Sequence, residues 1–145
     1  MRVIDANVLL NAVNSSADHY QVAHDWLEGA LNGDEVVGIP WLVIIAFIRI
    51  STLPHGFPKP FDVSAALHFV RDWLSVSNVV VLNVPSTDDH LDIVEALLNK
   101  AGRAGNLVND AHIAAIAQVL DAEVVTFDSD FGKFPGIRWI TPGQV

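Results

Sequence analysis

The chain has 145 residues, no cysteine and a formal net charge of −9, which fits one domain, residues 1–145, with its own core. The absence of cysteine excludes disulfides, thiol catalysis and cysteine-based zinc sites and agrees with a cytoplasmic location, and no apolar run is long enough to span a membrane. The acidic charge argues against a basic nucleic-acid-binding surface of the usual kind. Contact with phosphates would need a bound cation between acidic side chains and the phosphate groups.

The first part of the chain alternates short β-branched runs with stretches of helical apolar spacing. The expected elements are strands at residues 2–4 and 36–39 and helices at residues 6–14, 18–31 and 41–51. Pro40 fits the first turn of the last of these helices. That helix is apolar on nearly every side, which indicates burial on two sides. We expect the second side to be a subunit interface.

The alternation continues after an irregular loop at residues 53–61, which contains three prolines and a glycine. The expected elements beyond it are helices at residues 63–74, 87–100 and 109–120 and strands at residues 79–82, 123–126 and 138–140. A glycine-containing loop at residues 102–106 and a turn at residues 128–134 separate the last elements.

Alternating strands and helices predict an α/β domain with a mainly parallel sheet. Right-handed crossovers then give a three-layer α/β/α sandwich. We expect the strand order 3-2-1-4-5, which makes the first and fourth strands neighbours where the order reverses. Ligands of open α/β sheets bind at that point, beyond the carboxyl ends of the strands.

Four aspartates lie near this expected reversal point. Asp5 directly follows the first strand, and Asp128 and Asp130 follow the fourth strand. Asp110 begins the helix that leads into the fourth strand. Carboxylates that converge cannot all stay ionised unless a pKa rises or a cation binds. Oxygen ligands of this kind select Mg²⁺ or Mn²⁺, and a cation held there can activate water and stabilise charge on a phosphodiester.

Each of these aspartates also has a purely structural interpretation. Asp5 can cap the helix that follows it, and Asp110 can stabilise a helix start through the helix dipole. Asp128 and Asp130 lie in a turn, where aspartate is common for local reasons. The joint placement of the four residues, rather than any one of them, favours a metal site.

Several segments carry a resemblance to a known family. They are residues 3–10 (VIDANVLL), 47–52 (FIRIST, at the end of the helix that follows Pro40), 105–115 (GNLVNDAHIAA) and 124–131 (VVTFDSDF, followed by Phe134-Pro135-Gly136). They occur in the right order over nearly the whole chain. The sequence thus resembles the PIN-domain ribonucleases, and specifically the VapC toxins of bacterial VapBC toxin–antitoxin pairs.

The resemblance implies a PIN-like fold and endonucleolytic cleavage of structured RNA, such as transfer RNA or ribosomal RNA, with Mg²⁺ or Mn²⁺ as cofactor. It implies a VapB-type antitoxin as partner, a homodimer and no membrane association. Residue by residue, it assigns Asp5 and Asp110 as principal metal ligands and Asp128 as a further ligand. These three are expected to be catalytic, and Asp130 is a weaker candidate ligand.

One departure concerns the helix at residues 41–51. Many family members carry a glutamate where this chain has Ala46, and no acid occurs in residues 41–52. The departure argues for one protein-bound metal rather than a permanent two-metal site. It leaves open a degenerate PIN domain that binds metal or RNA as a regulatory module without nuclease activity. A relative of DNA flap nucleases or exonucleases is a further alternative, against which the short chain argues.

Other polar residues have two interpretations each. Asn7 either orients a metal-bound water or makes local hydrogen bonds, and Thr126 can hydrogen-bond a ligand carboxylate. His112 lies two residues after Asp110, on another helix face, and we interpret it as structural or exposed. Arg49 either approaches the site or lies along the surface. Further possible phosphate contacts are Lys59, Arg103, Lys133 and Arg138.

Overall fold

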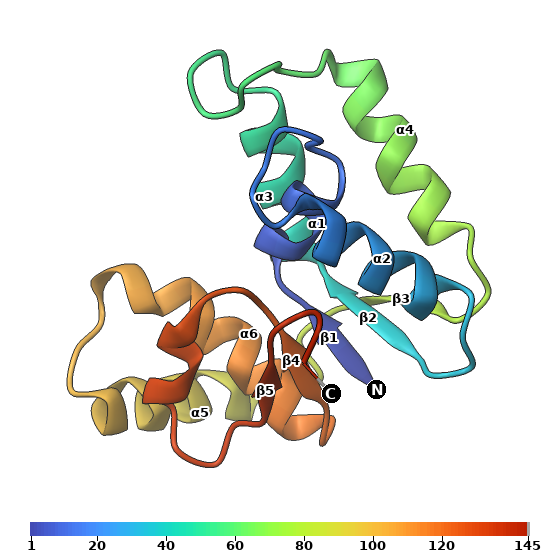
Figure 1. Cartoon of the computed structure of the whole chain (residues 1–145). Helices are drawn as coiled ribbons and strands as arrows, with labels where there is room; N and C mark the ends of the chain where they lie inside the picture. Colours follow the sequence, from blue (N-terminus) through green and yellow to red (C-terminus); the bar gives the residue numbers. More distant parts are fainter. Residues whose placement is uncertain (145) are drawn as a thin grey trace.

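A computed structural model, which describes residues 1–144, contains a five-stranded sheet with helices on both faces (Figure 1). The strands are β1 (Arg2–Ile4), β2 (Val37–Pro40), β3 (Val79–Leu82), β4 (Glu123–Val125) and β5 (Trp139–Ile140). Every pairing is parallel, and the strand order is β3-β2-β1-β4-β5. The predicted three-layer sandwich and its order 3-2-1-4-5 are confirmed.

The central strands are short runs of buried residues, as a parallel sheet covered on both faces requires. Val3 and Ile4 of β1 and Val124 and Val125 of β4 are fully buried. The register places Ile4 opposite Val125, and the amide of Asp5 donates to the carbonyl of Val125 at 3.0 Å. The carboxyl ends of β1 and β4 therefore lie side by side, where the strand order reverses.

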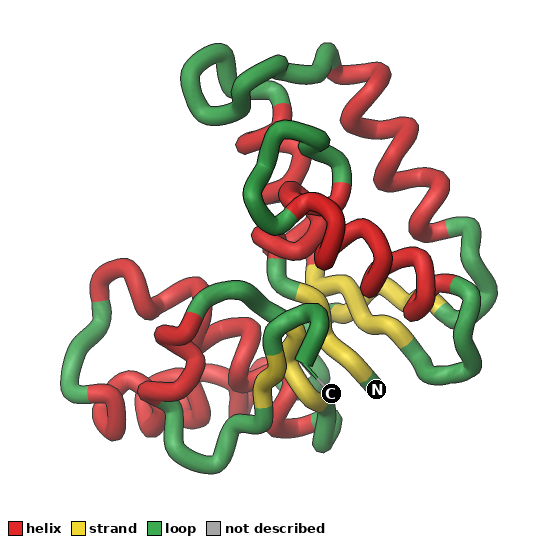
Figure 2. Tube along the Cα trace, viewed as in Figure 1, coloured by secondary structure: helices red, strands yellow, loops and turns green. Residues whose placement is uncertain are grey.

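Two groups of helices cover the sheet. Figures 1 and 2 show α1–α4 on one side and α5 and α6 on the other. The helices are α1 (Ala6–Ala12), α2 (Tyr20–Leu31), α3 (Trp41–Ser51), α4 (Val63–Leu74), α5 (Thr87–Ala101) and α6 (Val108–Val119), with short 3₁₀ helices η1 (Gly105–Leu107) and η2 (Ser129–Lys133). Buried alanines, Ala111, Ala114 and Ala115 among them, let α6 pack closely against its neighbours.

The observed ends differ from the predicted ends by at most two residues, and the differences have local causes. Helix α1 ends at Ala12 rather than at residue 14. Near that end, the side-chain amide of Asn11 donates to the carbonyl of Asn7 at 2.7 Å and competes with the helical hydrogen bonds. The turn predicted at residues 128–134 contains η2, which starts where the amide of Asp130 donates to the carboxylate of Asp128 at 2.9 Å.

Helix α3 begins and ends where the sequence predicts, but this chain buries only one of its sides. Val43, Ile44 and Phe47 face the core, whereas the side chains of Trp41 and Ile45 are 49% and 57% exposed. The second side is exposed in the single chain, as a side reserved for a subunit interface would be, and that interface stays a prediction. Neither α3 nor any other helix in residues 1–144 has the length and apolar character that crossing a membrane requires.

Candidate metal centre

Three segments of the chain bring aspartates to the ends of β1 and β4. Asp5 follows β1, Asp128 and Asp130 lie just beyond β4, and Asp110 lies in the first turn of α6. One carboxylate oxygen from each of Asp110, Asp128 and Asp130 lies within 4.8 Å of the other two. We call these three residues the acidic cluster. The structure thus brings together three of the four predicted ligands in one group, and Asp5 lines a cavity together with Asp110.

Three hydrogen bonds hold the buried carboxylate of Asp5. Its Oδ1 accepts from the amide of Ala6 at 2.7 Å and so caps α1. Its Oδ2 accepts from the hydroxyl of Thr126 at 2.8 Å and from the side-chain amide of Asn7 at 3.1 Å. The capping interpretation of Asp5 is therefore correct. It does not exclude a metal role, because a carboxylate offers about four acceptor positions.

Asn7 and Thr126 join the ends of β1 and β4. The side-chain amide of Asn7 donates to Thr126 Oγ1 at 3.1 Å, and Asn7 Oδ1 accepts from the amide of Phe127 at 3.0 Å. The hydroxyl of the fully buried Thr126 also accepts from the amide of Asp128 at 2.9 Å. The expected hydrogen bond from Thr126 to an aspartate carboxylate is present. The side chain of Asn7 makes one local bond, to Asp5, as one of its two interpretations expected, and two bonds to residues far away in the sequence.

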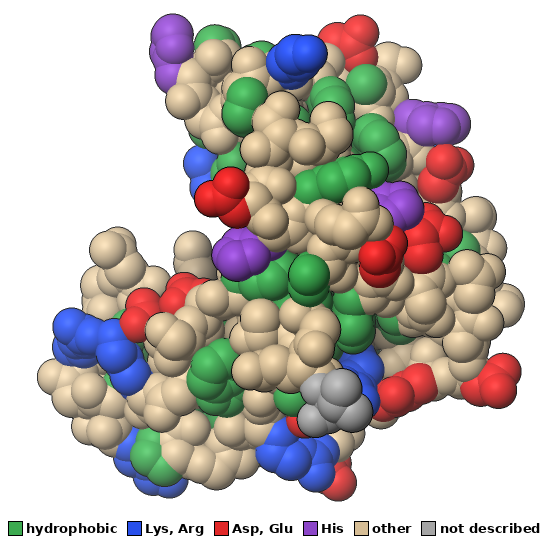
Figure 3. Space-filling model, viewed as in Figure 1, with side chains coloured by type: hydrophobic (Ala, Val, Ile, Leu, Met, Phe, Trp, Pro, Cys, Tyr) green, Lys and Arg blue, Asp and Glu red, His purple; other side chains and the backbone are tan. Residues whose placement is uncertain are grey.

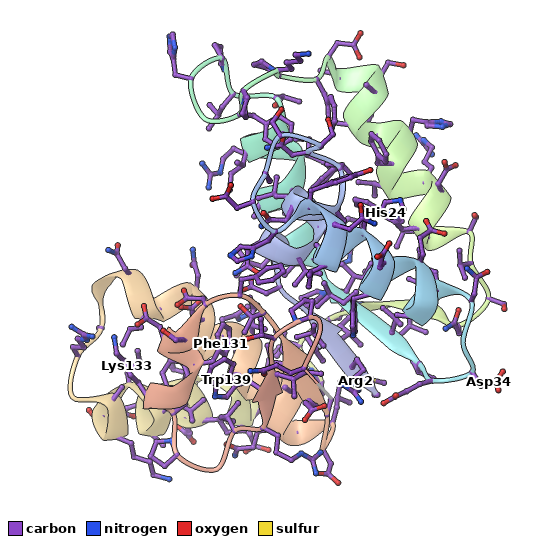
Figure 4. The ribbon with its side chains drawn as sticks, in the orientation of Figure 1. Arg2, His24, Asp34, Phe131, Lys133 and Trp139 are labelled. Atoms are coloured by element: carbon purple, nitrogen blue, oxygen red, sulfur yellow. The ribbon has the colours of Figure 1, made fainter. Side chains whose placement is uncertain are left out.

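The helix η2 holds the two later members of the acidic cluster. The carboxylate of Asp128 accepts from the amide of Asp130, which is the turn role also expected of Asp128. Lys133, visible on η2 in Figure 4, pairs with Asp130. Arg138, in contrast, pairs with Asp121 at 3.1 Å. Of the four basic residues considered as phosphate contacts, only Lys133 contacts the acidic cluster within the described residues.

The electrostatics of the site disfavour negative charge in the absence of a cation. Burial is the main reason that the pKa of Asp110 rises from its ordinary 3.8 to about 7. The negative charges of Asp5, Asp128 and Asp130 add to this rise. Burial also raises the pKa of Asp5, and the charge of Asp128 adds to it, although the three hydrogen bonds act in the opposite direction. A cation bound here would relieve this repulsion.

A cavity of about 280 Å³ opens beside Asp5 and Asp110, between α1, α3 and α6. Its other walls are mostly apolar side chains of α3. Ala46 lines it, so the position that carries a glutamate in many family members faces the aspartates and here offers only a methyl group. Arg49 lines the same cavity and forms no ion pair with another residue in the described part of the chain.

A larger cavity of about 730 Å³ lies by the amino ends of the strands. Arg2, labelled in Figure 4, lines it with Glu35 and Glu123, and it pairs with them at 3.2 and 2.8 Å. Arg2 thus already pairs with both glutamates of this cavity. Within residues 1–144, the only group of three or more side chains arranged to hold a metal ion is the acidic cluster. The candidate site is therefore the smaller cavity and the cluster beside it.

The side chains present fit a hard divalent cation. The acidic cluster offers only carboxylate oxygens, which Mg²⁺ and Mn²⁺ prefer over nitrogen or sulfur. Burial, together with the charges of Asp5, Asp128 and Asp130, raises the pKa of Asp110, so a bound cation would stabilise its ionised form. His112 does not join this group, because its Nδ1 lies 2.8 Å from Nε2 of His90. Burial lowers the pKa of His112, and His90 adds to this; the pair connects α5 with α6, a structural role as expected.

Two contacts of Phe127 were not predicted. Its amide bonds to Asn7, and its ring stacks on His19 with centroids 4.4 Å apart and planes at 10°. Both contacts join residues that are far apart in the sequence, so no local spacing indicates them. The only available signal was the position of Phe127 directly before Asp128.

Comparison with known proteins identifies the family of the chain. The PIN domain family matches residues 2–137. Ribonuclease VapC37 of Mycobacterium tuberculosis is 44% identical over 142 residues, which cover 98% of this chain and 97% of that protein. Ribonuclease VapC33 of the same organism is 34% identical and covers 98% of each.

Solved structures share the fold. The crystal structure of VapBC2 from Rickettsia felis, bound to a DNA fragment from their promoter, aligns with a TM-score of 0.67 and 20% identity over 97% of each chain. The structure of VapC20 from Mycobacterium tuberculosis, a sarcin–ricin loop cleaving toxin, aligns with a TM-score of 0.69 and 20% identity over 95% of this chain and 99% of that one. Because the family match and the identity to VapC37 extend over nearly the whole sequence, the chain belongs to the PIN-domain family, in its branch of VapC ribonucleases.

Proposed function

We propose that this chain is a divalent-metal-dependent endoribonuclease toxin that hydrolyses phosphodiester bonds in structured RNA and is neutralised by an antitoxin of the VapB type. One observation carries the proposal. Asp5, Asp110, Asp128 and Asp130, the carboxylates that the VapC resemblance assigns as ligands, lie at the paired ends of β1 and β4. A 44%-identical relative named a ribonuclease supports a nuclease over a degenerate binding module, although Ala46 lines the cavity.

In this proposal, Asp5 and Asp110 are the principal metal ligands, Asp128 is a further ligand and Asp130 is a weaker one. When bound, Mg²⁺ or Mn²⁺ supplies an activated water and stabilises charge on the phosphodiester. Asp5 cannot rotate freely, since Thr126 and Asn7 hold its Oδ2 and the amide of Ala6 holds its Oδ1. These bonds fix the carboxylate in one orientation before substrate arrives.

The chain's own positive charges near the site are few, and each has a distinct role. Lys133 partly offsets the charge of Asp130. Arg49 lines the cavity beside Asp110, where its guanidinium can bind a phosphate oxygen of the RNA. Ala46 supports one protein-bound metal, because the cavity wall formed by α3 adds no carboxylate.

In this proposal, the protein acts in the cytoplasm. Its partners are structured RNA, an antitoxin and a second copy of the chain. Structural neighbours include VapBC complexes from Rickettsia felis and Salmonella typhimurium, both bound to DNA, which supports an antitoxin partner here. The exposed Trp41 and Ile45 of α3 supply an apolar side that a homodimer would bury.

The test is cleavage of a pool of structured RNAs, including transfer RNA and ribosomal RNA fragments, by the purified protein. We expect cleavage with Mg²⁺ or Mn²⁺, none in EDTA, and none with Asp110→Asn. The matched control is Asp92→Asn, which removes the same charge from an exposed position on α5 outside the acidic cluster. Cleavage that persists in EDTA, or in the Asp110→Asn protein, contradicts the proposal.

A further inference from the structure

A stacked pair of rings lies next to the candidate metal centre. The imidazole of His19 and the ring of Phe127 lie 4.4 Å apart between centroids, with their planes at 10°. His19 precedes the first residue of α2, and Phe127 lies between Thr126 and Asp128 beyond β4. The two residues come from distant parts of the chain and meet in an almost parallel stack.

The two rings differ in how firmly the fold holds them. Phe127 is half-buried against the core, and its amide donates to Asn7 Oδ1 at 3.0 Å. His19 is exposed, and its side chain makes no hydrogen bond to cap α2. Its stack on Phe127 is the only side-chain interaction found for it among residues 1–144, where no hydrogen bond or ion pair of its imidazole occurs. His19 is therefore an exposed ring that stacks on a half-buried one, and its stack on Phe127 occupies only one of its two faces.

The position of this pair ties it to the acidic cluster. Phe127 directly precedes Asp128, and Asn7 binds both the amide of Phe127 and the carboxylate of Asp5. The side chain of Asn7 thus helps to position both Phe127 and the carboxylate of Asp5. Figure 3 shows acidic and histidine side chains along the recess between the part of the molecule that contains α1–α4 and the part that contains α5 and α6.

The charge of the protein makes a stacking contact chemically useful. The chain has eight Lys and Arg against seventeen Asp and Glu, so few direct contacts from basic side chains to phosphates are available to bind RNA. Stacking of unpaired bases on aromatic side chains, histidine included, does not depend on a basic surface. A flat ring with one free face beside the cleavage site offers such a contact.

We infer that the open face of His19, backed by Phe127, is a binding subsite for an unpaired nucleobase next to the phosphodiester that is cleaved. The inference rests on the proposed ribonuclease function and names a part of its substrate: RNA in which a base beside the cut is free to leave its helix. His19 and Phe127 form what we call the stacking platform. It contributes to the choice of RNA rather than to the chemical step.

The binding test uses hairpin RNAs that carry 2-aminopurine at one loop position at a time. The fluorescence of 2-aminopurine falls when it stacks, so the readout reports the contact itself. The Asp110→Asn protein is used in Mg²⁺, so that the RNA is bound but not cut. We expect quenching at one loop position. His19→Ala in this background should abolish the quenching and weaken binding about 5- to 150-fold, whereas His19→Phe should retain both.

The control and the cleavage arm separate the possible failures. His68→Ala removes another exposed histidine, on α4 and paired only with Asp72 at 3.2 Å, and should change neither quenching nor affinity. With active protein, His19→Ala should raise KM for a cleaved hairpin far more than it lowers kcat. Equal binding and quenching by His19→Ala overturns the stacking platform, as does an equal loss in His19→Phe, because that variant keeps a ring. If the wild type cleaves a hairpin and no loop position is quenched, the stacking platform is overturned and the ribonuclease function stands. If quenching depends on His19 and the wild type cleaves no RNA, the stacking platform is supported and the ribonuclease function is refuted.

Discussion

The metal-free protein is expected to become more stable when Asp110 is replaced by asparagine. The pKa of Asp110 rises from 3.8 to about 7 on folding, and a shift of about 3 units corresponds to about 4 kcal/mol of unfavourable free energy at neutral pH if it is fully transmitted. The side chain is partly exposed, so solvent screening reduces this to about 1–2 kcal/mol. Asparagine at this position keeps the size of the side chain and carries no charge.

This stabilisation has a defined dependence on pH. The folded carboxyl of Asp110 keeps its proton at pH values where the unfolded carboxyl has lost it, because the folded pKa is the higher one. The free energy of unfolding of the metal-free wild type therefore falls as the pH rises from about 4 to about 7. The advantage of Asp110→Asn over the wild type should grow from pH 5 to pH 7 and stay constant above pH 8. The raised pKa of Asp5 acts in the same direction and remains in the variant.

Urea unfolding in EDTA at several pH values, followed by circular dichroism, measures the effect. The control Asp92→Asn should stay within about 0.5 kcal/mol of the wild type, as surface substitutions usually do. Added Mn²⁺ should stabilise the wild type and reduce or reverse the advantage of Asp110→Asn. If Asp110→Asn is no more stable than the wild type at pH 7.5 in EDTA, burial and the neighbouring carboxylates do not destabilise the ionised form of Asp110 as its raised pKa implies.

Three further substitutions test other parts of the site. Thr126→Val removes the hydroxyl that bonds Asp5, Asp128 and Asn7. It should lower the free energy of unfolding by about 1–3 kcal/mol, and it should lower kcat. Unchanged urea unfolding would contradict the role of this hydroxyl as a bridge between the three residues. Ala46→Glu adds a carboxylate to the cavity wall. It should lower the Kd for Mn²⁺, measured by calorimetry, about tenfold, which is equivalent to about 1.4 kcal/mol. An unchanged Kd would mean that a side chain at position 46 does not reach the ion. Arg49→Gln should raise KM for RNA. It should also lower the slope of log KM against log salt concentration by about 1, the change expected when one phosphate contact is lost. An unaltered slope rules out a contact between Arg49 and an RNA phosphate.

The sheet and its strand order could be predicted because each strand carries its own signal. Short β-branched runs such as residues 79–82 stand between helical patterns, and the handedness of crossovers leaves few ways to arrange them. The approach of Asp5 to the end of β4 followed from that order alone. Helix ends were less accurate, since they depend on side-chain bonds such as that from Asn11 to Asn7.

The details of the site depend on contacts that no spacing encodes. That Asn7 bonds to the amide of Phe127, and that His19 stacks on the same residue, follows only from the way α1 and the start of α2 lie over the end of β4. What covers the exposed side of α3 also lies beyond the reach of sequence spacing. Composition reports that Trp41 and Ile45 are apolar, but it does not say whether this chain or another covers them.

The bond between Thr126 and Asp5 spans 121 positions of the chain, and this has a consequence for synthesis. The first strand leaves the ribosome long before the fourth, so Asp5, Asp110 and Asp128 cannot share a site on a nascent chain. Premature termination before residue 123 yields a fragment that lacks β4 and the last two aspartates. The proposed metal site is therefore complete only after β4 and the segment beyond it have been translated, and copies that stop before residue 123 cannot assemble it.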